Sequence, residues 1–326
     1  MRDHCCTRRT WLVASIAGAL AIFGAGKAGY AQGTWTELAP VPAPTEGMTV
    51  GGVGKVIITA YGASSTGDTN LTRLYDITTD SWSLGSPAPL PARSEAAYGD
   101  TTHAGFLYVI GGGNSGGVLS DLQRYDPVTD TWTTLASMPT ARAGTVAAAV
   151  DSNIFVIGGR LSAAGPCNGG PYLATVEKYD IDTNTWSAVA SLPSPRSDLA
   201  AVTHGGKVFV FGGCTGTGSV TSEVDMYNPE TNTWTTGLAP MPTARASIVA
   251  GHSGQRIYAI GGWDGVSPMN VNEVYNIAGN SWSTETATPT ACLEAGTHSH
   301  AGRVYVVGGA SPAFGSSTAA NEVFKP

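Results

Sequence analysis

One pattern recurs six times along this chain and limits its fold more than any other feature. In each repeat an apolar run ends in a glycine pair, and a Tyr or Phe further on precedes a Trp. These positions are Trp35, Trp82, Trp132, Trp186, Trp234 and Trp282, with Tyr61-Gly62, Gly111-Gly112, Gly158-Gly159, Gly212-Gly213, Gly261-Gly262 and Gly308-Gly309. The tryptophans are 47 to 54 residues apart. A period near 50 residues predicts a ring or array of similar supersecondary units.

Each repeat is predicted to form four short strands, named a to d from the inside outward. The apolar run is strand b, as in FLYVIGG (106–112) and KVFVFGG (207–213). Its β-branched and aromatic residues suit a strand buried on both faces. In five repeats the Tyr of strand c precedes the Trp of strand d by seven residues, with turn-forming residues between them. These two strands therefore form a hairpin whose two rings can find polar partners at the sheet margin.

The two ends of the chain complete one another. After Gly309 only a strand c remains, residues 321–326, whereas a matching strand d, residues 34–39, stands before the first strand a. Pairing these two segments completes a sixth unit and removes the exposed edges of an open array. The sequence therefore predicts an all-β fold of six closed units, with 34–39 as the closing strand.

On these motifs the chain resembles the kelch-repeat six-bladed β-propeller family. The resemblance covers essentially all of residues 33–326, with a single Gly62 in the first repeat and Trp35 supplied to the last from the other end. It implies one propeller domain over residues 32–326. It does not fix the function, because propellers are scaffolds for unrelated activities. Kelch-like propellers include interaction modules, a bacterial periplasmic sialic acid mutarotase and the copper radical galactose oxidases.

Residues 1–31 have the pattern of a secretory signal peptide. Arg8 and Arg9 precede an apolar stretch from Trp11 to Gly26, and small residues follow up to Ala31. The arginine pair also resembles a twin-arginine signal, so Sec and twin-arginine export both remain open. The sequence predicts cleavage near Ala31, a secreted or periplasmic location in a bacterium, and no stable membrane insertion afterwards.

The charge balance argues against nucleic acid as a partner. Residues 1–31 hold four of the 17 basic and one of the 24 acidic side chains, which leaves 13 and 23, a net charge near −10. Nucleic-acid binding requires a positive surface. The predicted partner is a protein or a glycan.

Three cysteines lie beyond residue 31: Cys167, Cys214 and Cys292. Cys167 and Cys214 follow the glycine pairs of adjacent repeats, so their loops leave the same face. An oxidising compartment favours a disulfide between them, with Cys292 unpaired. Three buried free thiols are the alternative.

Comparison between repeats gives most histidines and arginines a structural role. His103, His204, His252 and His300 are assigned to the turn between strands a and b, where a polar residue caps backbone groups. Glu294, His298 and His300 have a spacing that suits a metal, but His300 already belongs to the turn, so no metal and no cofactor is predicted. Arg93, Arg142, Arg196 and Arg245 recur just before strand a and are predicted to hold loop carbonyls or a neighbouring blade.

The candidate site lies on the face that carries the b–c and d–a loops. Its residues differ between repeats: Glu46, Glu95, Asp198 and Glu294 before strands a, and Arg160, Trp263 and Asp264 after the glycine pairs. A Trp beside an acid suits sugar stacking or a peptide anchor. An ordinary solvated acidic rim is the alternative. The long loop 160–173 lies there too, and binding often resides in such loops.

The sequence favours a binding module for a polypeptide or glycan, because it offers no complete catalytic set and no catalytic residue is assigned. The alternative is a periplasmic carbohydrate-active enzyme similar to a sialic acid mutarotase or epimerase. In that case Glu95 or Asp198 would act as acid or base, and Arg160 would bind an anionic group.

Overall fold

The computed structural model describes residues 32–99, 101–215, 219–313 and 315–326, all within one compact unit. The predicted signal peptide, residues 1–31, lies outside the described residues. Every regular element of the described ranges is a β-strand. None of these residues belongs to a helix long and apolar enough to cross a membrane.

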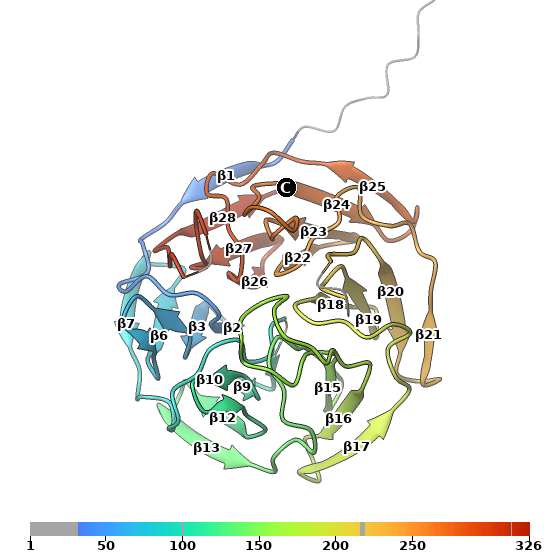
Figure 1. The fold of residues 1–326 in the computed structure, drawn as a ribbon. Coiled ribbons are helices and arrows are strands. Elements are labelled where there is room, and N and C mark those ends of the chain that lie inside the picture. The colour runs from blue at the N-terminus through green and yellow to red at the C-terminus, as the bar shows by residue number, and fades with distance from the viewer. Residues whose placement is uncertain (1–31, 100, 216–218, 314) are drawn as a thin grey trace, which may run out of the picture. The chain divides into compact units, whose positions relative to one another are not determined.

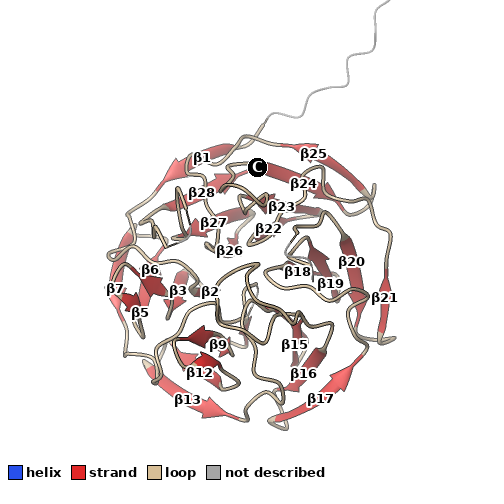
Figure 2. Cartoon of the chain, in the orientation of Figure 1, coloured by secondary structure: helices blue, strands red, loops and turns tan. Residues whose placement is uncertain are grey.

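Six four-stranded antiparallel sheets stand around a central axis as the blades of a propeller (Figures 1 and 2). From the inside outward the strands are β2 (Thr49–Val53), β3 (Val56–Ala60), β6 (Thr72–Asp76) and β7 (Ser81–Leu84) in blade 1; β8 (Thr102–His103), β9 (Phe106–Ile110), β12 (Leu122–Asp126) and β13 (Thr131–Leu135) in blade 2; β14 (Val146–Val150), β15 (Asn153–Ile157), β16 (Val176–Asp180) and β17 (Thr185–Val189) in blade 3; β18 (Ala200–His204), β19 (Lys207–Phe211), β20 (Val224–Asn228) and β21 (Thr233–Thr235) in blade 4; β22 (Val249–Ser253), β23 (Arg256–Ile260), β24 (Asn272–Asn276) and β25 (Ser281–Thr284) in blade 5; and β26 (Gly296–His300), β27 (Arg303–Val307), β28 (Asn321–Lys325) and β1 (Thr34–Glu37) in blade 6. Two small hairpins, β4 (Ala63–Ser64) with β5 (Gly67–Asp68) and β10 (Gly113–Asn114) with β11 (Gly117–Val118), lie in the b–c loops of blades 1 and 2.

The predicted closure is confirmed. Strand β1 pairs antiparallel with β28, with Trp35 opposite Phe324, and the two lie side by side in Figure 1. The closing strand ends at Glu37 rather than at residue 39, because the Ala39 N–H instead donates to Asp80 Oδ1 of blade 1 at 2.7 Å. The all-β six-bladed fold predicted from the repeat is therefore the observed one.

The hydrophobic core is divided among the blade interfaces. Six clusters of buried side chains each combine residues of two adjacent blades. The residues of each strand b contribute to the hydrophobic clusters on both faces of their blade, as the apolar runs predict. Ile257 and Ile260 of β23, for example, belong to clusters on opposite sides of blade 5. Burial of these faces requires a neighbour on each side, so closure of the ring completes the core.

A polar clamp repeats between adjacent blades. Ala190 of blade 3 donates its N–H to Asn232 Oδ1 at 2.8 Å and accepts the Trp234 indole N–H at 2.9 Å. Asn232 Oδ1 also accepts the Tyr227 hydroxyl at 2.8 Å. The same arrangement occurs at Ala39 with Asp80, Trp82 and Tyr75; at Ser86 with Asp130, Trp132 and Tyr125; at Ala136 with Asn184, Trp186 and Tyr179; and at Ala239 with Asn280, Trp282 and Tyr275. The Tyr that marks the repeat is thus bonded to the Asx side chain, and the Trp is bonded to the backbone carbonyl of the same preceding-blade residue whose N–H the Asx accepts.

Blade 6, which closes the ring, lacks both the Tyr hydroxyl and the Asp or Asn side chain that accepts its hydrogen bond in the other blades. Phe324 occupies the position of the Tyr, and Gly33 that of the Asp or Asn. Trp35 still donates to the Thr286 carbonyl at 2.9 Å, and the Thr286 hydroxyl donates to the Gly33 carbonyl at 2.6 Å. A Cβ on Gly33 would overlap the Phe324 ring and lie 2.6 Å from the Lys325 carbonyl, so glycine is required there.

The four recurring arginines are buried within their own blades. Arg142 donates to Glu177 of strand c at 2.5 Å and to the Gly158 carbonyl at 2.9 Å. The corresponding pairs are Arg93–Asp121, Arg196–Asp225 and Arg245–Glu273. All four side chains have no exposed surface. Each arginine therefore ties the d–a loop to strand c of its own blade rather than to a neighbour.

We predict that replacing Asn232 by Gly lowers the free energy of unfolding by about 1–2 kcal/mol, because the Tyr227 hydroxyl and the Ala190 N–H lose their acceptor. Asn232 has a φ of 53°, which glycine adopts without strain, so backbone strain does not contribute. Urea denaturation measures the change. Asn232→Asp is the control, because Asp holds this position in blades 1 and 2, and it should be nearly neutral. Equal losses in the two variants would contradict the clamp.

Candidate functional site

A closed ring of backbone hydrogen bonds surrounds the propeller axis at one end. One residue just before each strand a takes part: Gly47, Glu95, Gly144, Asp198, Ser247 and Glu294. Each N–H donates to the carbonyl of the corresponding residue in the preceding blade, over 2.7 to 3.3 Å, and the Gly47 N–H donates to the Glu294 carbonyl. We call these six residues the axial ring. It lies on the face that carries the b–c and d–a loops, hereafter the loop face.

All six residues of the axial ring have a left-handed backbone, with φ between 50° and 63°. Glycine adopts this region freely, whereas a Glu pays a conformational penalty there. Carboxylates stand at blades 2, 4 and 6, and Gly or Ser stands at blades 1, 3 and 5. The ring member of blade 1 is Gly47; Glu46, grouped with the others in the sequence analysis, instead forms a β-bridge with Ala63.

Arg160 lies buried against the ring. Its Nη1 donates to both oxygens of Asp198 at 2.7 Å, and its Nη2 donates to Glu95 Oε2. The side chains of Arg160 and Asp198 have no exposed surface, and that of Glu95 is 9% exposed. Arg160 therefore does not stand at an open rim, as the sequence suggested. It compensates two buried acids.

The absence of a side chain at Gly144 makes room for the Arg160 guanidinium beside the axial ring. A Cβ at Gly144 would overlap Arg160 Nη1 and lie 2.6 Å from Asp198 Oδ1. Asp198 is further held by the Ser197 hydroxyl at 2.6 Å and by the Cys167 N–H at 3.2 Å. The cluster is thus packed and mutually bonded.

The acids around the ring exceed the available positive charge. Glu46 and Glu294 are also buried, and Glu294 Oε1 has no hydrogen-bond partner among the described residues. Burial, partly opposed by Arg160, raises the pKa of Glu95 to about 7. Burial also raises the pKa of Glu294 well above its usual value, and the nearby Glu95 and Glu46 add to this effect. Glu294 therefore holds its proton to a higher pH than an exposed glutamate does. Glu46, Glu95, Asp198 and Glu294 form a buried cluster at the axis rather than the solvated rim of the alternative interpretation.

Trp263 and Asp264 lie apart from this buried cluster. Trp263 is partly buried against Tyr172 and Val220, in a cluster that contains Cys167 and Cys214. Asp264 Oδ1 accepts the N–H groups of Val266 and Ser267, each at 2.8 Å. This turn leaves Val266 88% exposed.

A disulfide fastens the long loop of blade 3 to blade 4. It joins Cys167 to Cys214, with Cα atoms 5.3 Å apart, the pair that the sequence favoured. The Tyr172 hydroxyl donates to the Cys167 carbonyl at 2.9 Å and closes the loop on itself. Cys292 is free and buried, and burial, with a contribution from Glu322, raises its pKa to about 12.

The described residues offer little to a metal ion. Cys167, Cys214 and Asp198 bring ligand atoms within 4.8 Å of one another, but the two sulfurs are bonded together and Asp198 is bonded to Arg160. Within the described ranges Glu294, His298 and His300 do not form such a group. The sequence prediction of no cofactor remains a prediction.

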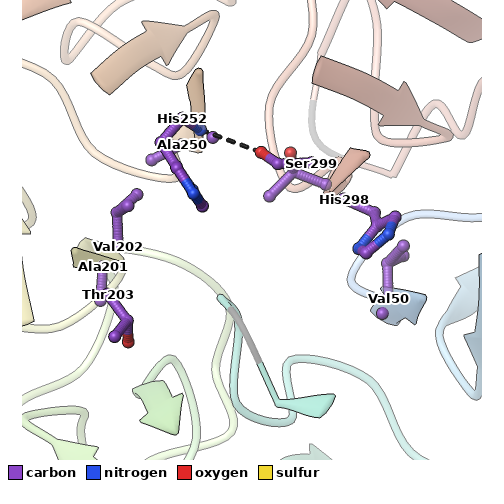
Figure 3. A pocket seen from close by; sticks show the side chains of 11 residues that line it. Val50, Ala201, Val202, Thr203, Ala250, His252, His298 and Ser299 are labelled. Atoms are coloured by element: carbon purple, nitrogen blue, oxygen red, sulfur yellow. Dashed lines mark hydrogen bonds between the residues drawn. The ribbon is translucent and has the colours of Figure 1, made fainter. Parts of the chain in front are cut away.

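The other end of the central channel carries the histidines. His103, His204 and His300 end their strands beside the a–b turn, as predicted, but His252 lies one position earlier within β22. His252 and His298 line a cavity of about 50 Å³ with Thr203 and Ser299 (Figure 3). The His252 N–H donates to Ser299 Oγ at 2.9 Å, which joins blades 5 and 6.

The four-stranded blades and the closed axial ring define a six-bladed propeller, in which the loops differ from blade to blade. Comparison with known proteins then gives the family: residues 163–324 match the KLHDC2/KLHL20/DRC7 Kelch-repeats domain, and residues 97–139 match the Kelch motif. The chain belongs to the kelch-repeat β-propellers, which are in general protein-interaction modules.

Individual relatives resemble only parts of this chain or only its fold. Kelch-like protein 25 of Xenopus tropicalis is 37% identical over 131 residues, 39% of this chain and 22% of that protein. Kelch-like protein 23 of Homo sapiens is 28% identical over 210 residues, 64% of this chain and 35% of that protein. A solved structure titled "Structure of YjhT" matches with a TM-score of 0.73 at 19% identity, covering 87% of this chain and 95% of that one. The chain therefore spans about a third or less of these curated relatives, and the solved structure supports the fold alone.

We predict that Gly144→Ala destabilises the protein by about 1–3 kcal/mol, because the added Cβ overlaps the Arg160 guanidinium and because alanine is strained at a φ of 58°. Thermal unfolding measures the loss. Ser247→Gly is the matched control at the same ring position and should be neutral or slightly stabilising, since Ser247 already has a φ of 50°. An Ala variant as stable as the parent would mean that Arg160 does not occupy this place.

We predict that Glu294→Gln is more stable than the parent protein at about pH 8, and that the difference shrinks toward about pH 5. The pKa of Glu294 is raised on folding, so the unfolded chain releases this proton more readily. The parent therefore loses stability as the pH rises above the unfolded value of 4.5, whereas Gln does not titrate. Urea denaturation at both pH values tests this, with exposed Glu37→Gln as control. A difference independent of pH would refute it.

Proposed function

We propose that this chain is an exported kelch-repeat propeller that binds a polypeptide through the loop face. Export is supported by the charged, apolar and small-residue segments of residues 1–31. Binding is supported by one observation above all, the distribution of exposed apolar side chains over the two faces.

Most of the exposed large apolar side chains lie toward the loop face, on several different blades. Five such side chains occur in the described residues. Four of them lie in b–c loops, in a d–a loop or at the end of a strand d, namely Leu84 (69% exposed), Leu90 (76%), Leu161 (44%) and Val266 (88%). Only Val128 lies at the opposite face, in a c–d turn. Exposed apolar side chains concentrated on one face of a propeller suit a protein partner better than solvent.

The support beneath these side chains is rigid. Leu161 begins the loop that the disulfide fastens to blade 4, and Val266 belongs to the turn that Asp264 caps. Trp263 and Tyr172 pack against the same disulfide. Because these loops are already ordered, a partner pays less conformational entropy on binding.

The alternative, a carbohydrate-active enzyme, has one observation in its favour and one against it. Glu95, with its pKa raised to about 7, has the acidity of a general acid or base near neutral pH. However, Arg160 is wholly buried and bonded to Glu95 and Asp198, so it cannot bind an anionic sugar without breaking both bonds. NMR of the sialic acid anomers with and without the protein tests this alternative: faster exchange of anomers would favour it.

We predict that Leu161→Ser and Val266→Ser together reduce peptide binding about tenfold or more, because exposed apolar anchors contribute about 1 kcal/mol or more each. The probe is an array of short peptides of random sequence, and fluorescence anisotropy gives the affinity of those retained. Val128→Ser is the control, since Val128 is 87% exposed on the opposite face. If no peptide binds while an array of glycans does, the polypeptide assignment is wrong.

A further inference from the structure

We propose that the loop face selects basic segments, in which Lys or Arg residues flank an apolar side chain. This inference rests on the proposed polypeptide binding and adds the chemistry of the partner. It follows from where the fold places every positively charged side chain of residues 32–326.

The cations of the loop end are all buried. Residues 32–326 contain 13 Lys and Arg. Six of these are buried arginines, namely Arg73, Arg93, Arg142, Arg160, Arg196 and Arg245. Five of the six are bonded to carboxylates, and Arg73 donates to the Thr45 hydroxyl at 3.1 Å. Buried guanidinium groups that are already bonded cannot attract an acidic partner.

The remaining cations lie away from the loop face. Lys55, Lys207, Arg256 and Arg303 stand at the a–b turns, and Lys325 stands at the far end of β28. Arg124 and Lys178 lie in the middle of strands c, and Arg124 packs over the Phe106 ring, which begins strand b at the a–b end. In the part of the chain that the structure describes, therefore, no exposed Lys or Arg lies in a b–c or d–a loop.

Carboxylates at the loop end are partly exposed, in contrast. Glu37 is exposed at the end of β1, and the Glu223 side chain is 53% exposed beside Arg196, at 3.6 Å from Nη1. Asp68 and Asp264 are partly exposed in their b–c loops. Asp264 lies between Trp263 and the exposed Val266, so an acid adjoins the apolar anchors. A surface of one sign around apolar anchors favours a partner of the opposite sign.

The two faces therefore differ in the partners that they suit. An acidic segment would meet only carboxylates and apolar groups at the loop face. The opposite end carries both signs, because cations and the five histidines of residues 32–326 stand there beside c–d turn carboxylates such as Asp126 and Asp180, which are partly exposed, and Asp182, which is exposed. The loop face differs from it in having no exposed cation among the described residues. A neutral partner would bind with no dependence on salt. A basic segment is the occupant that satisfies both the apolar anchors and the charge.

The test uses three peptide sets that share a central Trp or Leu and differ only in their flanks, which are Lys/Arg, Ser or Glu. Fluorescence anisotropy is measured with the chain lacking residues 1–31. We expect the basic set to bind about tenfold or more tighter than the acidic set at low salt. This ratio should shrink in about 0.5 M NaCl, where exposed charges are screened.

Two matched substitutions locate the effect. Asp264→Asn removes the charge but keeps Oδ1 as acceptor for the N–H groups of Val266 and Ser267, so the turn is preserved. It should weaken the basic set by about two- to fivefold, the range of one exposed charge pair. Asp182→Asn removes the same charge from an exposed c–d turn of the opposite face and should change nothing.

The outcomes separate this inference from the proposed function. If all three sets bind equally and the binding falls in the Leu161→Ser, Val266→Ser variant, the function stands and the preference for basic segments is refuted. If Asp182→Asn weakens the basic set and Asp264→Asn does not, the basic segment binds the other face and the inference is overturned. If none of the sets binds, both proposals fail.

Discussion

Six backbone N–H groups, each donating to the carbonyl of the preceding blade, hold the centre of this propeller together. Because the hydrogen bonds form a closed circle, every blade must deliver one residue to the axis in a left-handed conformation. Gly47 and Gly144 do so without strain, whereas Glu95 and Glu294 accept an unfavourable backbone. The axial ring thus fixes the start of every strand a, and the blade interfaces follow from it.

Closure of the ring also determines the electrostatics of the site. Glu95, Asp198 and Glu294 come from blades 2, 4 and 6, and they approach one another only because the circle is complete. Arg160 compensates two of these acids, and burial raises the pKa of the third, Glu294. This chemistry stabilises the centre of the disc. The exposed loops that surround it include the loop stiffened by the Cys167–Cys214 disulfide, and they form the surface that we propose for binding a partner.

The distribution of arginines connects the repeat to the proposed specificity. Four of the six d–a loops are fastened by a buried Arg, as in the Arg142–Glu177 pair, so these cations are withdrawn from the surface of the loop face. The exposed cations then lie in the a–b turns and along strands c. The absence of exposed cations from the described loop face therefore follows in part from how the repeat is built, whereas Trp263, Asp264 and Val266 are particular to blade 5.

The spacing of the tryptophans and glycine pairs determined the strands, the number of blades and the closing pair of β1 and β28, because these are local patterns repeated along the chain. Comparison of Cys167 with Cys214 across adjacent repeats gave the disulfide for the same reason. The sequence could not show that Arg160 is buried, that Gly47 rather than Glu46 enters the axial ring, or that His252 lies inside its strand. The position of His252 depends on the register of β22 with β23. The other two facts depend on distances across the axis between residues of different blades. Only the closed tertiary structure sets such distances, since burial and charge pairing arise when all six blades converge.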